Sequence, residues 1–117
     1  VDHPDKSHIC IFDELYSGTN PYEAICSAYS YLDYINKNKN VTFLLTTHFI
    51  KLSKLLAKNK SIKNNCMKTE IENYKSKYYY KLINGISTIK GGITVLNELD
   101  YPKEILDNSL DILEKLE

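Results

Sequence analysis

The feature that most constrains the fold is a pair of short apolar runs with a helix-forming stretch between them. The first run covers His8 to Phe12, and the second, rich in β-branched and aromatic residues, covers Val41 to Leu45. Runs of this length are typical of strands, and a nearly continuous apolar strand is typical of one that is buried on both faces of a parallel sheet. We therefore expect the first run to be a central strand.

The stretch between the runs predicts a helix from about Pro21 to Asn36. Asn20 suits the N-cap, Pro21 the first helical position, and Glu23 the positive end of the helix. The apolar positions recur at spacings of three and four residues and predict one buried stripe, made of Ile25, Ala28, Tyr29, Leu32 and Ile35. Strand, helix and strand predict a βαβ crossover, which places the carboxyl ends of both strands at one edge of a parallel sheet.

The remaining residues predict further helices and a strand pair. The expected elements are a helix over 49–59, strands over 62–71 and 78–83 joined by the polar stretch 72–77 as an antiparallel hairpin, and helices over 89–99 and 102–117. The apolar side chains expected to face inward are Ile50, Leu52, Leu55 and Leu56 in the first of these helices, and Ile105, Leu106, Leu110, Leu113 and Leu116 in the last. The lysines of the first are expected to form a solvated face.

Composition sets broad limits on function. The chain has 117 residues, and its 15 basic and 15 acidic side chains cancel, so it lacks the overall positive charge that binds nucleic acid through phosphates. No apolar run approaches the roughly 20 residues needed to span a bilayer. The three cysteines, Cys10, Cys26 and Cys66, lack metal-ligand spacing, which favours a reducing cytoplasmic or nuclear compartment. Because the chain opens on Val1, we expect a fragment of a longer protein.

Two carboxylates follow the first strand, and a histidine follows the second. Asp13, at the end of a rigid strand, suits a Mg²⁺ ion bound to nucleotide phosphates. Glu14 suits the orientation of an attacking water, and His48 suits a hydrogen bond to the γ-phosphate or to that water. Taken singly, these residues are better explained as a polar loop and a structural histidine, whereas their order along a βαβ unit is specific.

The turn that precedes the expected helix supports an anion site. Small hydroxyl and glycine residues at a helix start expose backbone N–H groups, and the turn consists of Ser17, Gly18, Thr19 and Asn20. The alternative for this turn alone is an ordinary capped helix.

Residues Phe12 to Ala24, together with Thr46-Thr47-His48-Phe49, resemble the ATPase domain of the MutS family of DNA mismatch repair proteins. Later segments are similar to the family as well: Tyr80-Lys81-Leu82, Gly85-Ile86-Ser87 and Gly91-Gly92-Ile93. ABC transporters share the strand-end Asp-Glu and the later histidine but place their glycine-rich signature before that strand. Here Ser17-Gly18-Thr19 follows it, which favours MutS.

The resemblance implies an α/β fold in which residues 1–117 are the C-terminal half of a P-loop NTPase domain of the ABC/MutS type, with a βαβ unit, a strand pair and C-terminal helices. It implies that Asp13 coordinates Mg²⁺, that Glu14 activates water and that His48 senses the γ-phosphate of ATP. It also implies that four residues face the nucleotide of a partner subunit: Ser17, Gly18, Thr19 and Asn20.

The Walker A motif that holds the phosphates, Gly-x-x-x-x-Gly-Lys-Ser/Thr, is absent from the sequence. By the resemblance it lies N-terminal to this chain, so the chain alone is expected to be inactive. The resemblance implies a homo- or heterodimer with a second MutS-like subunit, contact with mismatched or branched DNA through other domains, a MutL-like partner, and no membrane.

Three other interpretations remain open. Tyr16, Ser17 and Ala24 depart from the usual residues of the family, which is compatible with a non-catalytic module for dimerisation or partner binding. The chain is alternatively a generic α/β protein. The third interpretation rests on the tyrosines of 78–80, which lie next to lysines and suggest stacking on nucleic-acid bases.

Overall fold

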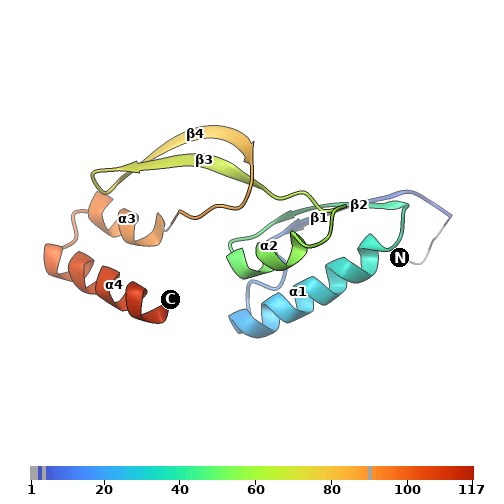
Figure 1. Ribbon diagram of the computed structural model, residues 1–117, viewed down its shortest axis with the longest axis horizontal. Helices are drawn as coiled ribbons and strands as arrows, with labels where there is room; N and C mark the ends of the chain where they lie inside the picture. Colours follow the sequence, from blue (N-terminus) through green and yellow to red (C-terminus); the bar gives the residue numbers. More distant parts are fainter. Residues whose placement is uncertain (1–2, 4, 90) are drawn as a thin grey trace. The chain divides into compact units, whose positions relative to one another are not determined.

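The computed structural model describes residue 3, residues 5–89 and residues 91–117. Four helices and four strands follow one another along these residues, and they form two compact units (Figure 1). The first unit ends at Asn64 and the second begins at Asn65. The mixed α/β class that the sequence predicts is confirmed.

The first unit is a βαβ crossover followed by a short helix. Its elements are β1 (His8–Asp13), α1 (Pro21–Asn36), β2 (Val41–Thr46) and α2 (Ile50–Leu56). β1 pairs with β2 in parallel, in a register that runs from His8 opposite Val41 to Asp13 opposite Thr46. The predicted crossover and the predicted bounds of α1 are confirmed, whereas α2 ends three residues earlier than expected.

The core of this unit lies between α1, α2 and one face of the two-stranded sheet. Its buried members come from the two helices: Ala28, Leu32, Ile35, Leu52 and Leu56. Phe12 and Phe43 reach this core from the sheet, and the Phe12 ring meets the ring of Tyr31 edge-on at a centroid distance of 5.8 Å. Most of the predicted stripe of α1 is therefore confirmed, although Ile25 and Tyr29 are only partly buried.

The opposite face of the same sheet is open to solvent. Ile9 is 77% exposed, Ile11 76% and Leu44 64%. The expectation that β1 is a central strand buried on both faces is therefore wrong for this structure, in which the described part of the sheet contains β1 and β2 alone. The reason is geometric: successive side chains of a strand point to opposite faces, and α1 and α2 cover the face of Phe12 and Phe43.

The second unit is an antiparallel hairpin followed by two helices. Its elements are β3 (Asn65–Glu72), β4 (Lys75–Asn84), α3 (Gly91–Glu98) and α4 (Lys103–Leu116). The hairpin is confirmed, and its connection lies within the predicted polar stretch 72–77 but is shorter, because both strands extend into that stretch. The turn consists of Asn73 and Tyr74, with φ values of 50° and 59°. Two successive left-handed residues match the twist of a hairpin, and asparagine tolerates this conformation well.

One end of α3 is fastened to the tip of the hairpin. Asn97 donates a hydrogen bond through Nδ2 to the Tyr74 carbonyl at 2.9 Å, and Glu98 accepts one through Oε1 from the Ser76 amide at 2.6 Å. The predicted start of α3 at Ile89 is two residues too early, and Lys90, which follows it, lies outside the described residues. α4 buries no residue fully, and of its predicted stripe Ile105 and Leu116 remain exposed.

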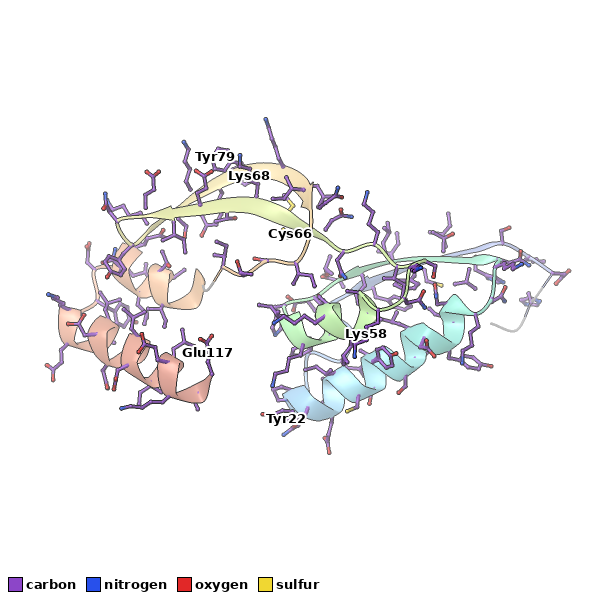
Figure 2. All side chains as sticks on the ribbon, viewed as in Figure 1. Tyr22, Lys58, Cys66, Lys68, Tyr79 and Glu117 are labelled. Atoms are coloured by element: carbon purple, nitrogen blue, oxygen red, sulfur yellow. The ribbon has the colours of Figure 1, made fainter. Side chains whose placement is uncertain are left out.

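The tyrosines of β4 lie in different surroundings. Tyr79 and Lys68 lie beside each other on the hairpin (Figure 2). The Tyr79 hydroxyl donates to Glu70 at 2.5 Å, and the Tyr79 ring lies 4.5 Å and 5.0 Å from the amines of Lys68 and Lys77. Tyr80, at the irregular part of the strand, is exposed and left-handed, with a φ of 54°. None of the helices in the described part of the chain has the length and apolar character needed to cross a membrane.

Leu32 and Leu44 offer a matched test of where the core lies, since the first is fully buried and the second is mostly exposed. We expect Leu32→Ala to lower the free energy of unfolding by about 3 kcal/mol, because it leaves a cavity. Leu44→Ala is expected to lower it by less than about 1 kcal/mol, since the methyl groups it removes already face solvent. Urea unfolding of the two variants would measure both values, and equal losses would contradict the described core.

Candidate functional site

The predicted site residues meet where β1 and β2 end. Asp13 is the last residue of β1 and pairs with Thr46, the last residue of β2. Glu14 follows Asp13 directly, and His48 lies two residues beyond Thr46. The parallel crossover therefore brings Asp13, Glu14 and His48 to one edge of the sheet, where ligands of open α/β sheets bind.

Thr46 joins the two strand ends through its hydroxyl and its carbonyl. The hydroxyl donates to Oδ1 of Asp13 at 2.6 Å. The backbone amide of Glu14 donates to the Thr46 carbonyl at 3.0 Å and also to the Thr46 hydroxyl at 3.2 Å. Thr46 was not predicted as a site residue, because the βαβ pattern places both strand ends at one edge but does not specify the register that sets Thr46 opposite Asp13.

Glu14 and His48 face each other across the edge. Nδ1 of His48 lies 3.7 Å from Oε1 of Glu14, which is within ion-pair range if the imidazole is protonated and longer than a hydrogen bond. The side chain of His48 is 63% exposed and that of Glu14 is 54% exposed, so both are open to a ligand. The His48 ring also packs against Phe49 at a centroid distance of 4.5 Å, which limits the directions it can take.

The loop from Glu14 to Thr19 contains two left-handed residues that are not glycine. Glu14 has a φ of 51° and Tyr16 one of 61°, and the amide of Ser17 closes the turn on the Glu14 carbonyl at 3.0 Å. Non-glycine residues in this conformation cost about 1–3 kcal/mol each and are concentrated at functional sites. A Cβ added at Gly18 would meet nothing within 4 Å, so this glycine borders open space.

The backbone amides within the first turn of α1 are already hydrogen-bonded to Asn20. Oδ1 of Asn20 accepts from the amides of Tyr22 at 3.0 Å and Glu23 at 3.4 Å, while the Asn20 carbonyl accepts from Ala24 at 2.8 Å. Pro21 has no N–H to give. The N-cap prediction for Asn20 is thus confirmed, and the donors left in the turn belong to Gly18, Thr19 and the hydroxyl of Ser17.

Asp13 fits a Mg²⁺ ion that is bound mainly by a nucleotide. Thr46 donates to Oδ1 of Asp13, and no hydrogen bond or ion pair within the described residues reaches Oδ2, so one carboxylate oxygen remains for an ion or its water. No group of three or more histidine, cysteine, aspartate or glutamate side chains in this part of the chain could hold a metal alone. Mg²⁺ commonly takes one or two carboxylates together with phosphates and waters, which agrees with this donor set.

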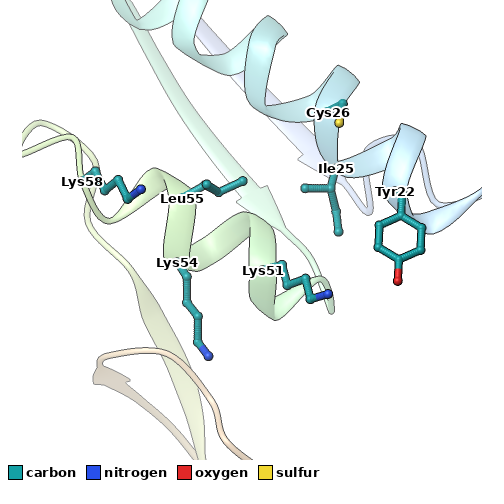
Figure 3. Close-up of a pocket in the computed structure, with 7 residues that line it drawn as sticks. All are labelled: Tyr22, Ile25, Cys26, Lys51, Lys54, Leu55 and Lys58. Atoms are coloured by element: carbon teal, nitrogen blue, oxygen red, sulfur yellow. The ribbon is translucent and has the colours of Figure 1, made fainter. Parts of the chain in front are cut away.

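A separate apolar pocket of about 420 Å³ lies between α1 and α2 (Figure 3). Its walls are side chains of Tyr22, Ile25, Cys26 and Leu55, with Lys51, Lys54 and Lys58 around them. The amine of Lys51 lies 5.3 Å from the Tyr22 ring. The expectation that the lysines of α2 form only a solvated face is therefore incomplete. None of the predicted site residues lines this pocket.

Comparison with known protein families identifies the family to which this chain belongs. The family described as MutS domain V matches residues 1–117. The chain belongs to the MutS family. It is 35% identical over 109 residues to the DNA mismatch repair protein MutS of Orientia tsutsugamushi (strain Ikeda) and 33% identical over 112 residues to that of Ehrlichia chaffeensis. A third MutS, from Listeria welshimeri, is 29% identical over all 117 residues.

These matches cover nearly all of this chain and a small part of its MutS relatives. They include 93% of the chain for the Orientia protein, 96% for the Ehrlichia protein and 100% for the Listeria protein. The chain spans 12% of the length of the first and 14% of the other two. The family of the chain is thereby established.

The N-cap of α1 can be tested by changing its single acceptor. Asn20→Ala removes the oxygen that accepts from Tyr22 and Glu23, and we expect it to lower the free energy of unfolding by about 1 kcal/mol. Asn20→Asp keeps an acceptor at the same place and should unfold like the parent protein in urea. If the alanine and aspartate variants lose the same stability, the cap does not hold this turn.

Proposed function

We propose that this chain supplies the magnesium-binding and water-activating half of an ATPase site in a MutS-like DNA mismatch repair protein. The observation that carries the proposal is the meeting of Asp13, Glu14 and His48 at one edge of a parallel βαβ unit. ATP hydrolysis there would be coupled to the conformation of the protein on DNA. The compartment would then be the cytoplasm or the nucleus.

Each side chain has a defined part in this chemistry. Bound Mg²⁺ supplies positive charge that neutralises the phosphates of ATP. Asp13 would hold the ion or one of its waters through Oδ2, the oxygen to which Thr46 does not donate. Glu14 accepts a hydrogen bond from the attacking water and takes its proton. His48, whose Nδ1 lies 3.7 Å from Oε1 of Glu14, would donate a hydrogen bond to the γ-phosphate.

The remaining parts of the site would come from other segments. We infer that a Walker A segment, which this sequence lacks, holds the phosphates and completes a P-loop NTPase domain of the ABC/MutS type. Ser17, Gly18 and Thr19 would complete the site of a second MutS-like subunit, consistent with the open space at Gly18. Asn20 would support them as the cap of α1. DNA and a MutL-like partner would bind through other domains.

A non-catalytic role in dimerisation is the second candidate function. The exposed apolar face of Ile9, Ile11 and Leu44 favours it, because a surface of this kind is usually covered by protein in a functional assembly. Both functions are compatible with that face. They differ in what the Glu14 carboxylate does, so a change confined to this carboxylate separates them.

The test uses the full-length product of the gene that encodes this chain. We expect Glu14→Gln to lower the ATP turnover number by about 10²–10³-fold, because the amide cannot take a proton from the attacking water. ATP affinity should be retained, since Asp13 and the phosphate-binding segment are unchanged. Steady-state turnover and equilibrium binding of a fluorescent ATP analogue would measure the two quantities.

The matched control is Glu23→Gln, which makes the same chemical change in the first turn of α1. It should leave turnover within about twofold of the parent protein. Unchanged turnover in Glu14→Gln would show that Glu14 does not activate water. Absence of ATP turnover in the parent protein itself would favour the non-catalytic candidate.

A further inference from the structure

We infer that the Thr46 hydroxyl is a positioning group that sets the direction of the Asp13 carboxylate and the backbone of Glu14, and so determines how tightly the site holds Mg²⁺. This inference rests on the proposed ATPase function and adds a residue to it. Thr46 would touch neither the nucleotide nor the attacking water, because its hydroxyl is already engaged on both sides.

The hydrogen bonds of Thr46 form one connected set. A threonine hydroxyl has a single proton, and here it is given to Oδ1 of Asp13 at 2.6 Å. The same oxygen accepts from the Glu14 amide at 3.2 Å. One hydroxyl therefore fixes a side-chain oxygen of the first carboxylate residue and the backbone of the second.

The distance of 2.6 Å between the Thr46 hydroxyl and Oδ1 of Asp13 is typical of a charge-assisted hydrogen bond. An O–H group that donates to an ionised carboxylate makes a charge-assisted bond at 2.5–2.7 Å, about twice as strong as a bond between neutral groups. Such a bond selects one orientation of the carboxylate plane. The oxygen left over, Oδ2, then points in a fixed direction, which matters for an ion that demands near-octahedral geometry.

The bond to Glu14 acts on a conformation that an L-residue rarely adopts. Glu14 has a φ of 51°, and its amide is shared between the carbonyl and the hydroxyl of Thr46. The carbonyl bond continues the parallel ladder and does not depend on the side chain at position 46. The hydroxyl bond is the additional restraint, and loss of it would allow the Glu14 backbone to relax away from the position opposite His48.

The experiment compares three variants of the full-length protein. Thr46→Val keeps the shape of the side chain and removes the hydroxyl, whereas Thr46→Ser keeps the hydroxyl. Thr42→Val makes the same change four residues earlier on the same exposed face of β2, opposite Ile9. The first readout is the affinity for Mn²⁺, a spectroscopic substitute for Mg²⁺, in complex with a non-hydrolysable ATP analogue, measured by electron paramagnetic resonance. The second is the hydrogen-exchange rate of the Glu14 amide without nucleotide.

We expect Thr46→Val to weaken Mn²⁺ binding at least fivefold and to speed exchange of the Glu14 amide by a similar factor. Thr46→Ser and Thr42→Val should stay within twofold of the parent protein in both measurements. If Thr46→Val binds Mn²⁺ like the parent, or if Thr46→Ser is as impaired as Thr46→Val, the hydroxyl does not position the site. If Thr46→Val does not fold, Thr46→Ala serves in its place, with the same expected results.

The two proposals fail in different ways. Loss of turnover in Glu14→Gln together with normal Mn²⁺ binding in Thr46→Val would overturn the role of Thr46 and leave the proposed function standing. Normal turnover in Glu14→Gln would overturn the water-activating role of Glu14, and with it the proposed function on which the role of Thr46 rests.

Discussion

The interaction on which the site depends is the parallel pairing of β1 and β2, carried through to their last residues. The register places Asp13 opposite Thr46, and one further backbone bond, from the Glu14 amide to the Thr46 carbonyl at 3.0 Å, extends the ladder beyond the strand. A shift by one residue would turn the Asp13 side chain to the helix-covered face of the sheet, because neighbouring side chains of a strand alternate between faces. Phe12 prevents such a shift, since its ring is packed into the core beside Tyr31. The packing of an apolar ring thus determines where a carboxylate lies.

Much of this arrangement could be predicted from the sequence, because it follows from local rules. The spacing of apolar residues predicted α1 with its correct bounds, Asn20 predicted the cap, and two apolar runs joined by a helix predicted parallel strands. The meeting of Asp13, Glu14 and His48 followed from that topology. Each of these features is decided by residues close together in the chain or by the handedness of a crossover.

The wrong or missing predictions concern features that long-range packing or single backbone torsions determine. The hairpin turn is set by left-handed torsions at Asn73 and Tyr74, and tyrosine carries no signal for this conformation. The burial of β1 on both faces was predicted from its composition, yet burial depends on what else covers the sheet, and the described helices of the first unit cover one face. The hydrogen bonds of Thr46 depend on a register and a side-chain rotamer that apolar periodicity does not specify.

The central claim is that Asp13, Glu14 and His48 surround the phosphates of ATP. The most direct test is a crystal structure of the full-length protein with Mg²⁺ and a non-hydrolysable ATP analogue. The account predicts an Asp13 oxygen on the Mg²⁺ ion or one of its waters, and Glu14 and His48 within about 3–4 Å of the γ-phosphate or of a water in line with it. A nucleotide bound elsewhere, or at this edge with the Glu14 carboxylate turned away from the γ-phosphate, would contradict it.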